Sequence, residues 1–169
     1  MEKMNPQYRL HTFSDGSNNE GQLQSIYDLN QANTPEVGSL DSTEDLKKLI
    51  ELSAYNLLVL KGVEIAGFII CMREGSTYGS ENYLFFTKRL KKFLYVDRVV
   101  IDEHHRREGL GKAIYHEIFN QAKKDNLPIA LEVNTQPINQ PSLDFHEKMG
   151  FDRIGVRDFN DHSVAYFVK

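Results

Sequence analysis

One short stretch of the chain combines glycines and cations at a spacing suited to holding an anion: DEHHRREGLGKAIYHEIFNQAKK, residues 102–124. Arg106, Arg107, Gly109 and Gly111 lie between a β-branched segment and a segment of helical periodicity. A helix N-terminus carries unpaired N–H groups and a partial positive charge, and glycine lets an anion approach them closely. The stretch therefore predicts a strand, an anion-binding turn and a helix, with a phosphate or pyrophosphate as the natural ligand.

Two common nucleotide-binding patterns do not fit this turn. The pattern G-x-x-x-x-G-K-[ST] fails because the glycines are two residues apart and Ala113 follows Lys112. The pattern G-x-G-x-x-G fails because position 114 is isoleucine. What remains is R-x-x-G-x-G, from Arg106 to Gly111.

Composition places the chain among ordinary globular proteins. Its 169 residues predict one domain, residues 1–169, and no apolar run approaches the roughly 20 residues of a membrane helix. The first residues lack the pattern of a signal peptide, so we expect a cytoplasmic protein that binds no membrane. A net charge of −4 argues against general nucleic-acid binding. The single cysteine, Cys71, excludes an internal disulfide, and the adjacent His104 and His105 have no helical ligand partners, so we expect no metal.

The elements that must position the turn alternate between strands and helices. Strands are expected at 7–13, 56–62, 64–74, 93–101, 128–134, 151–159 and 162–169, and helices at 20–33, from about 42, at 109–125 and at 141–150. A turn-rich stretch, 14–21, follows the first strand, and residues 74–93 are expected to form an irregular hairpin excursion. This order predicts a mixed α/β sheet without internal repeats.

The turn and the segments on either side of it resemble a known family. R-x-x-G-x-G is preceded by YVDRVVI and followed by LEVN and then N-x-x-S-x-x-F-H-x-x-x-G-F, a succession similar to that of the GCN5-related N-acetyltransferases, the GNAT superfamily. The resemblance implies the acyl-CoA N-acyltransferase fold: a mostly antiparallel sheet of about seven strands, with the fourth and fifth splayed apart, and about four helices. FFTKRLKKFLYVDRVV and EVNTQPINQPSLDFH resemble a bacterial branch of the superfamily, which does not identify the acceptor.

The resemblance also implies acetyl-coenzyme A as cosubstrate and names the residues that would hold it. The pyrophosphate would bind the turn, and the thioester arm would pair with the backbone of the fourth strand. Asn139 and Ser142 match positions that touch the arm, although Asn139 is equally suited to capping a helix. The implied binding residues are Val99, Val100, Ile101, Arg106, Arg107, Glu108, Gly109, Leu110, Gly111, Lys112, Asn139 and Ser142. The family often has Pro at position 103 and Gly at 107, where this chain has Glu and Arg.

Acetyl transfer to an amine needs a base, because an alkyl amine with a pKa of about 10.4 is mostly protonated at neutral pH. Glu132 matches a position used as the base in some relatives, and Asp97, two residues after Tyr95, is a second candidate; either carboxylate could instead form an ordinary ion pair. Many relatives carry a tyrosine acid where this chain has His146. An imidazole can also donate a proton, so His146 is the candidate acid, with a packed histidine as the alternative.

The acceptor would be a primary amine of a small molecule or a peptide, attacking directly in a ternary complex. Tyr78, Tyr83, Phe85 and Phe86 could form a pocket wall or a homodimer contact. The histidine at 146 leaves one alternative function open: a domain that binds or senses acyl-coenzyme A with weak or no transfer.

Overall fold

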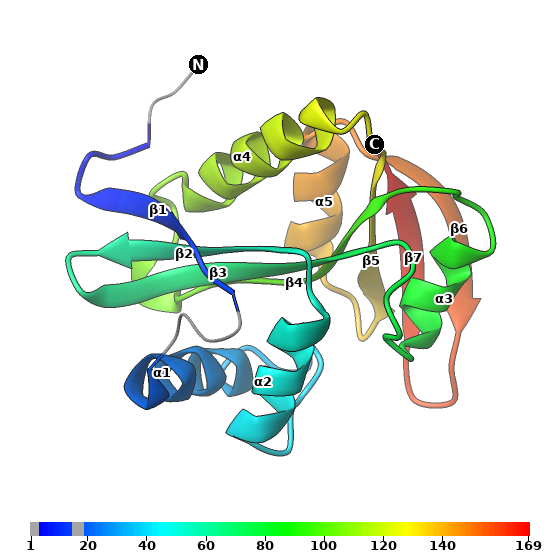
Figure 1. Ribbon diagram of the computed structural model, residues 1–169. Helices are drawn as coiled ribbons and strands as arrows, with labels where there is room; N and C mark the ends of the chain where they lie inside the picture. Colours follow the sequence, from blue (N-terminus) through cyan, green and yellow to red (C-terminus); the bar gives the residue numbers. More distant parts are fainter. Residues whose placement is uncertain (1–3, 15–18) are drawn as a thin grey trace.

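The computed structural model describes residues 4–14 and 19–169 (Figure 1). In these residues seven strands form one sheet, ordered β1-β2-β3-β4-β5-β7-β6. Half of the turn-rich stretch expected at 14–21 lies outside the described residues, since 15–18 fall in the gap; Glu20 and Gly21 belong to the first helix. The strands are β1 (Tyr8–Thr12), β2 (Tyr55–Lys61), β3 (Glu64–Arg73), β4 (Leu94–Ile101), β5 (Ile129–Gln136), β6 (Asp152–Asp158) and β7 (Ser163–Val168).

Helices cover both faces of the sheet (Figure 1). One face carries α1 (Glu20–Gln31), α2 (Thr43–Leu52) and α3 (Glu81–Thr87); the other carries α4 (Leu110–Lys124) and α5 (Gln140–Lys148). A short 3-10 helix, η1 (Glu103–His105), precedes α4. The mixed α/β fold expected from the sequence is confirmed.

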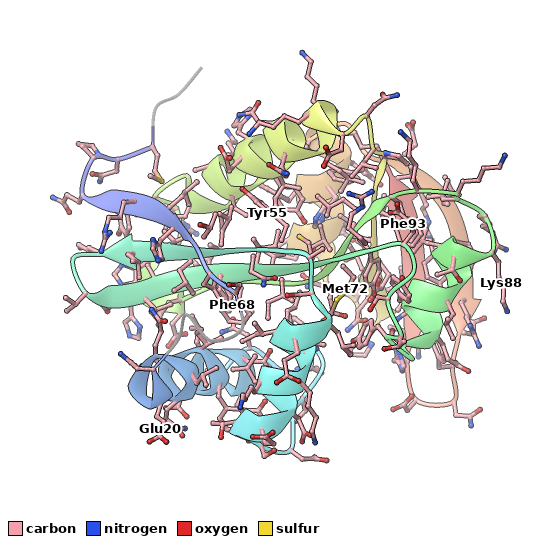
Figure 2. All side chains as sticks on the ribbon, viewed as in Figure 1. Glu20, Tyr55, Phe68, Met72, Lys88 and Phe93 are labelled. Carbon is pink, nitrogen blue, oxygen red and sulfur yellow. The ribbon has the colours of Figure 1, made fainter. Side chains whose placement is uncertain are left out.

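Strand side chains alternate between the two hydrophobic layers, as a period of two requires. In β2, Leu57 and Val59 pack beneath α4, whereas Leu58 and Leu60 pack against the α1 and α2 side. Figure 2 shows the same division for two labelled residues: Tyr55 lies toward α4, and Phe68 of β3 lies toward α1. Both faces of the central strands are therefore buried.

The excursion at 74–93 is not an irregular hairpin, because it contains α3. Tyr83 and Phe86, three residues apart, are fully buried on the inner face of this helix. Their rings contact Phe93 and Tyr95, so the helix is fixed by aromatic packing. A helix of only seven residues is marginal by local propensity, which is why periodicity did not predict it.

Two irregularities of the sheet create room for a site. First, β4 and β5 pair in parallel only at Leu94–Ile129 and Tyr95–Ala130 and then separate, while β3 continues to pair with β4 and β7 with β5. Second, a bulge in the β3–β4 pairing leaves Asp97 without a residue opposite it. The splayed pair expected for strands four and five is thus present.

No helix in the described part of the chain is long and apolar enough to cross a membrane.

Candidate active site

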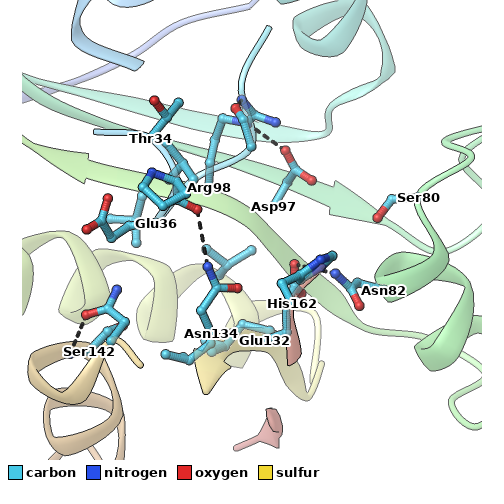
Figure 3. Close-up of a pocket in the computed structure, with 18 of the residues that line it drawn as sticks. Thr34, Glu36, Ser80, Asn82, Asp97, Arg98, Glu132, Asn134, Ser142 and His162 are labelled. Carbon is cyan, nitrogen blue, oxygen red and sulfur yellow. Dashed lines mark hydrogen bonds and ion pairs between the residues drawn. The ribbon is translucent and has the colours of Figure 1, made fainter. Parts of the chain in front are cut away.

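A cavity of about 630 Å³ lies where β4 and β5 separate (Figure 3). Residues 96–99 of β4 and 131–134 of β5 form its floor. The α1–α2 loop, residues 34–39, and the β6–β7 turn form its rim, and side chains from the α3, α4 and α5 regions complete the wall. Segments distant in sequence therefore meet at the splay.

Glu132 of β5 lines this cavity and accepts hydrogen bonds from two side chains. The Tyr95 hydroxyl lies 2.8 Å and 3.0 Å from its two carboxylate oxygens, and the Asn82 side-chain amide donates to Oε1 at 3.3 Å. Burial raises the pKa of Glu132 to about 8, and the nearby Asp97 charge adds to the rise; the hydrogen bonds from Tyr95 and Asn82 oppose it. A carboxyl group with this pKa can take up and release a proton near neutral pH.

Asp97, the second candidate carboxylate, also lines the cavity but is engaged in an ion pair. Arg98 Nε donates to its Oδ2 at 2.8 Å, and both side chains are more than nine-tenths buried. The same guanidinium donates from Nη1 to Asn30 and to the carbonyl of Gly38. Arg98 thereby connects Asp97 at the cavity floor to α1 and to the α1–α2 loop.

The α1–α2 loop is tied to elements on the other side of the splay as well. Asn134 of β5 donates to the carbonyl of Pro35 at 3.2 Å, the bond drawn across the cleft in Figure 3. Arg106 of the predicted anion turn donates to Asn33 at 3.0 Å. The loop thus contacts both walls of the cleft and the turn.

His146, the candidate acid, is buried in an aromatic cluster and lines the cavity. Its Nδ1 lies 2.7 Å from the carbonyl of Ser142, which can only accept, so Nδ1 carries the proton in the neutral ring. Nε2 then accepts from the Tyr115 hydroxyl, 2.6 Å away. Burial lowers the pKa of His146, so the neutral form dominates at neutral pH.

The anion turn has the geometry that the glycines predicted. Gly109 is the N-cap of α4 with φ of 72°, in the left-handed region that favours glycine, and Arg107 shares this region at 63°. Glycine provides no capping side chain, which leaves the helix N-terminus suited to an external anion. A Cβ at Gly111 would only touch the ring of Phe145, so Gly109 is the more constrained of the two glycines.

His105, directly before the turn, anchors it to the sheet. The residue is 6% exposed; Nε2 donates to Glu64 at 3.1 Å, and Nδ1 accepts from the Tyr8 hydroxyl at 3.0 Å. From the sequence alone, His105 is considered only together with His104, as a possible metal ligand, and that role is rejected. Among the described residues, no group of three His, Cys, Asp or Glu could hold a metal ion.

The structure brings together some of the predicted residues and separates others. Around the cavity it assembles Asp97, Val99, Glu132, Asn139, Ser142 and His146. Val100, Ile101 and the turn residues 106–112 do not line this cavity, because the turn follows the far end of β4. Asn139 caps α5 by accepting from the Ser142 N–H, the alternative role named for it.

Four residues at the site were missed by sequence reasoning: Tyr95, Tyr115, Asn82 and Asn134. The ion pair of Asp97 with Arg98 is the alternative that the sequence left open for this carboxylate. For two of the four missed residues, their position on a strand was a usable sequence signal. Tyr95 lies just before the point where β4 separates from β5. Asn134 lies two residues after Glu132, so both belong to the same face of β5.

Comparison with known proteins agrees with this geometry. The acetyltransferase (GNAT) family matches residues 23–151, so the chain belongs to this family. No curated protein sequence matches it significantly. Among similar solved structures, Arabidopsis thaliana NAA60 in complex with acetyl-CoA has a TM-score of 0.70 at 14% identity, covering 96% of this chain and 97% of that one.

Two further structures have similar folds. The NatC complex bound to Gag peptide and CoA gives a TM-score of 0.68 at 17% identity, covering 94% of this chain and 96% of that one. The ribosomal-protein-S18-alanine N-acetyltransferase from Escherichia coli gives 0.67 at 14% identity, covering 95% and 92%. At these identities the likeness establishes the fold.

Proposed function

We propose that the chain, as one domain spanning residues 1–169, is an N-acetyltransferase that moves the acetyl group of acetyl-coenzyme A to a primary amine. The proposal is carried by two features that occur together beside the gap between β4 and β5. One is the N-terminus of α4, which begins after Gly109. The other is Glu132, a carboxyl group in the cavity whose pKa is raised to about 8. The proposed location is the cytoplasm.

Acetyl-coenzyme A, the proposed cosubstrate, would lie along the gap between β4 and β5. Its pyrophosphate would bind the backbone N–H groups of the turn at 106–112, with Arg106 and Lys112 adding positive charge. Its thioester arm would pair with the edge of β4 along residues 99–101, which β5 leaves open. NAA60 in complex with acetyl-CoA and NatC bound to CoA, both of the same fold, support acetyl-coenzyme A as the cosubstrate.

The proposed acceptor is a cationic amine, either a small molecule or a peptide N-terminus. Arg98 pairs with Asp97, and the rim residues Glu36 and Asp161 add negative charge to the cavity lining beyond this ion pair. This excess of acidic groups attracts an ammonium group. The Gag peptide in the NatC complex and the alanine acceptor named for the Escherichia coli enzyme support a peptide as one acceptor class.

In the proposed reaction the ammonium group loses a proton to Glu132, directly or through water, and the free amine attacks the thioester carbonyl carbon. A C–N bond forms, the tetrahedral adduct loses its second nitrogen proton to solvent and collapses, and the C–S bond breaks to release the thiolate. Asp97 contributes negative charge for the ammonium group rather than serving as the first base, because Arg98 already occupies one of its oxygens.

The thiolate would receive its proton through Tyr115. A protonated His146 donates from Nε2 to the Tyr115 hydroxyl, and that hydroxyl gives its own proton to sulfur, so the charge balances across the 2.6 Å contact. Burial makes the protonated histidine scarce at neutral pH, so this relay contributes little. A thiolate is also a fair leaving group unaided.

The alternative function is a domain that binds acyl-coenzyme A with weak or no transfer. It is favoured by one observation, since both ring nitrogens of His146 are hydrogen-bonded inside the protein. Release of coenzyme A, measured with a panel of mono-, di- and polyamines and short peptides, separates the two functions. The transferase predicts release that depends on an amine and is lost in Glu132→Gln; tight binding without release would support the alternative. Sizing chromatography tests the homodimer, which stays a prediction.

A further inference from the structure

The segment at 74–93 supplies no reacting group in the proposed chemistry, yet its helix, α3, reaches Glu132, the proposed base. Asn82 lies on the first turn of α3, and its side chain lines the cavity beside Glu132 (Figure 3). The Tyr166 hydroxyl of β7 donates to Asn82 Oδ1 at 2.9 Å, while Asn82 Nδ2 donates to Glu132 Oε1 at 3.3 Å. The three residues form one directed chain of hydrogen bonds that ends on the carboxylate.

We propose that Asn82, oriented by Tyr166, is the positioning residue of the base: it fixes the orientation of the Glu132 carboxylate and stabilises its ionised form. This inference rests on the proposed transferase function. A flipped Asn82 would place its acceptor oxygen against the ionised carboxylate, which can only accept. The ionised form of Glu132 therefore requires the amide to present N–H to it, as observed.

Contacts between α3 and the sheet hold the framework behind Asn82. The Phe85 ring stacks on Tyr166 with 3.7 Å between ring centroids and an angle of 9° between the planes. Glu81, the residue before Asn82 in α3, forms an ion pair with Arg157 of β6 at 2.9 Å. This pair connects the start of α3 to the sheet. The location of α3 is thus fixed by contacts that do not themselves touch Glu132.

Asn82 differs from the other groups that face Glu132. From β4 come Tyr95, which donates to the carboxylate, and Asp97, whose negative charge favours the protonated form. Tyr78, Tyr115 and Tyr166 contribute uncharged phenols, since burial raises the pKa of each. Asn82 and Tyr95 are therefore the two side-chain donors that favour the carboxylate, and only Asn82 belongs to an element outside the splayed strands.

The decisive experiment compares pH–rate profiles of the natural protein, Asn82→Ala and Tyr166→Phe. Removing a hydrogen bond to a charged group should move the acidic limb of kcat upward by about one pH unit in Asn82→Ala. The rate at neutral pH then falls about tenfold, while the plateau at high pH is largely kept. Tyr166→Phe retains the ring stacked on Phe85 and loses only the hydroxyl, so a smaller shift in the same direction is expected.

A control and a second readout separate positioning from general damage and from failure of the function. Leu84→Ala alters an exposed position of the same helix and should leave the acidic limb of the pH–rate profile unchanged. A carbon-13 titration of the Glu132 carboxyl, assigned with Glu132→Gln, measures the same shift without turnover. An unmoved carboxyl titration in Asn82→Ala, or a rate loss equal at every pH, would overturn the inference. A moved titration in a protein that acetylates no amine would sustain it and refute the transferase instead.

Discussion

The two halves of the candidate site are built in different ways. The half proposed for the cosubstrate consists of backbone: the open edge of β4 and the N-terminus of α4 behind Gly109. The half proposed for the acceptor consists of side chains brought by the α1–α2 loop, the α3 region and the β6–β7 turn. A common ligand can thus be held by the fold itself, whereas acceptor choice depends on loops that can vary independently.

Glu132 lies at the junction of the halves, and its removal should have the largest effect. Glu132→Gln keeps the shape and loses the base, so kcat should fall about 10²- to 10⁴-fold. The dissociation constant for acetyl-coenzyme A, measured by calorimetry, should stay unchanged because the phosphate turn is untouched. Parallel losses in kcat and in cosubstrate affinity would mean that the two halves are not separable.

The same substitution predicts a pH-dependent change in stability. The pKa of Glu132 is raised to about 8 in the folded protein from an ordinary value near 4.3, so the folded state favours the protonated carboxyl. The stability gained by that proton is fully present below about pH 4.3 and is lost as the pH rises through 8. Glu132→Gln stays neutral, so its free energy of unfolding relative to the natural protein should improve between pH 5 and pH 8 and level off above that. Urea titrations check this; a difference that does not vary with pH would contradict the buried carboxyl.

The Tyr115–His146 pair should have a smaller effect on turnover. His146→Ala and Tyr115→Phe should each lower kcat by about tenfold or less, because the protonated histidine is scarce and a thiolate leaves readily. Tyr115→Phe is the matched variant, since it keeps the packed ring. Unchanged turnover in both variants would assign the pair a structural role.

Rim charges should have the smallest effect, confined to the acceptor. Glu36→Gln and Asp161→Asn should raise KM for a cationic amine about two- to fivefold each, as expected for exposed charges, and leave KM for acetyl-coenzyme A unchanged. Added salt should reduce the difference. Glu147→Gln, an exposed change on α5, is the control; an equal response there would show that the rim does not select charge.

The contrast between the halves also explains how far the sequence could be interpreted. The turn at 106–112 was predictable because a strand, a glycine at positive φ and a helix start are local features. Glu132 was named by family resemblance, but its bond to Tyr95 depends on an alignment of β4 with β5 across 37 residues. Asn82 could not be found, since its contact with Glu132 depends on the packing of α3. The parity of β5 places Asn134 on the same face as Glu132, but its bond to Pro35 depends on a loop that crosses the cleft.

The most direct test of the central claim is thermal stability with and without acetyl-coenzyme A, for the natural protein and for the Gly109→Asp, Gly111→Asp double variant. A ligand at 100 times its dissociation constant should stabilise the natural protein by about 2.7 kcal/mol. The account predicts this shift in the natural protein and its loss in the variant, where two carboxylates meet the phosphate turn. No shift at saturating acetyl-coenzyme A, or an equal shift in both proteins, would contradict it.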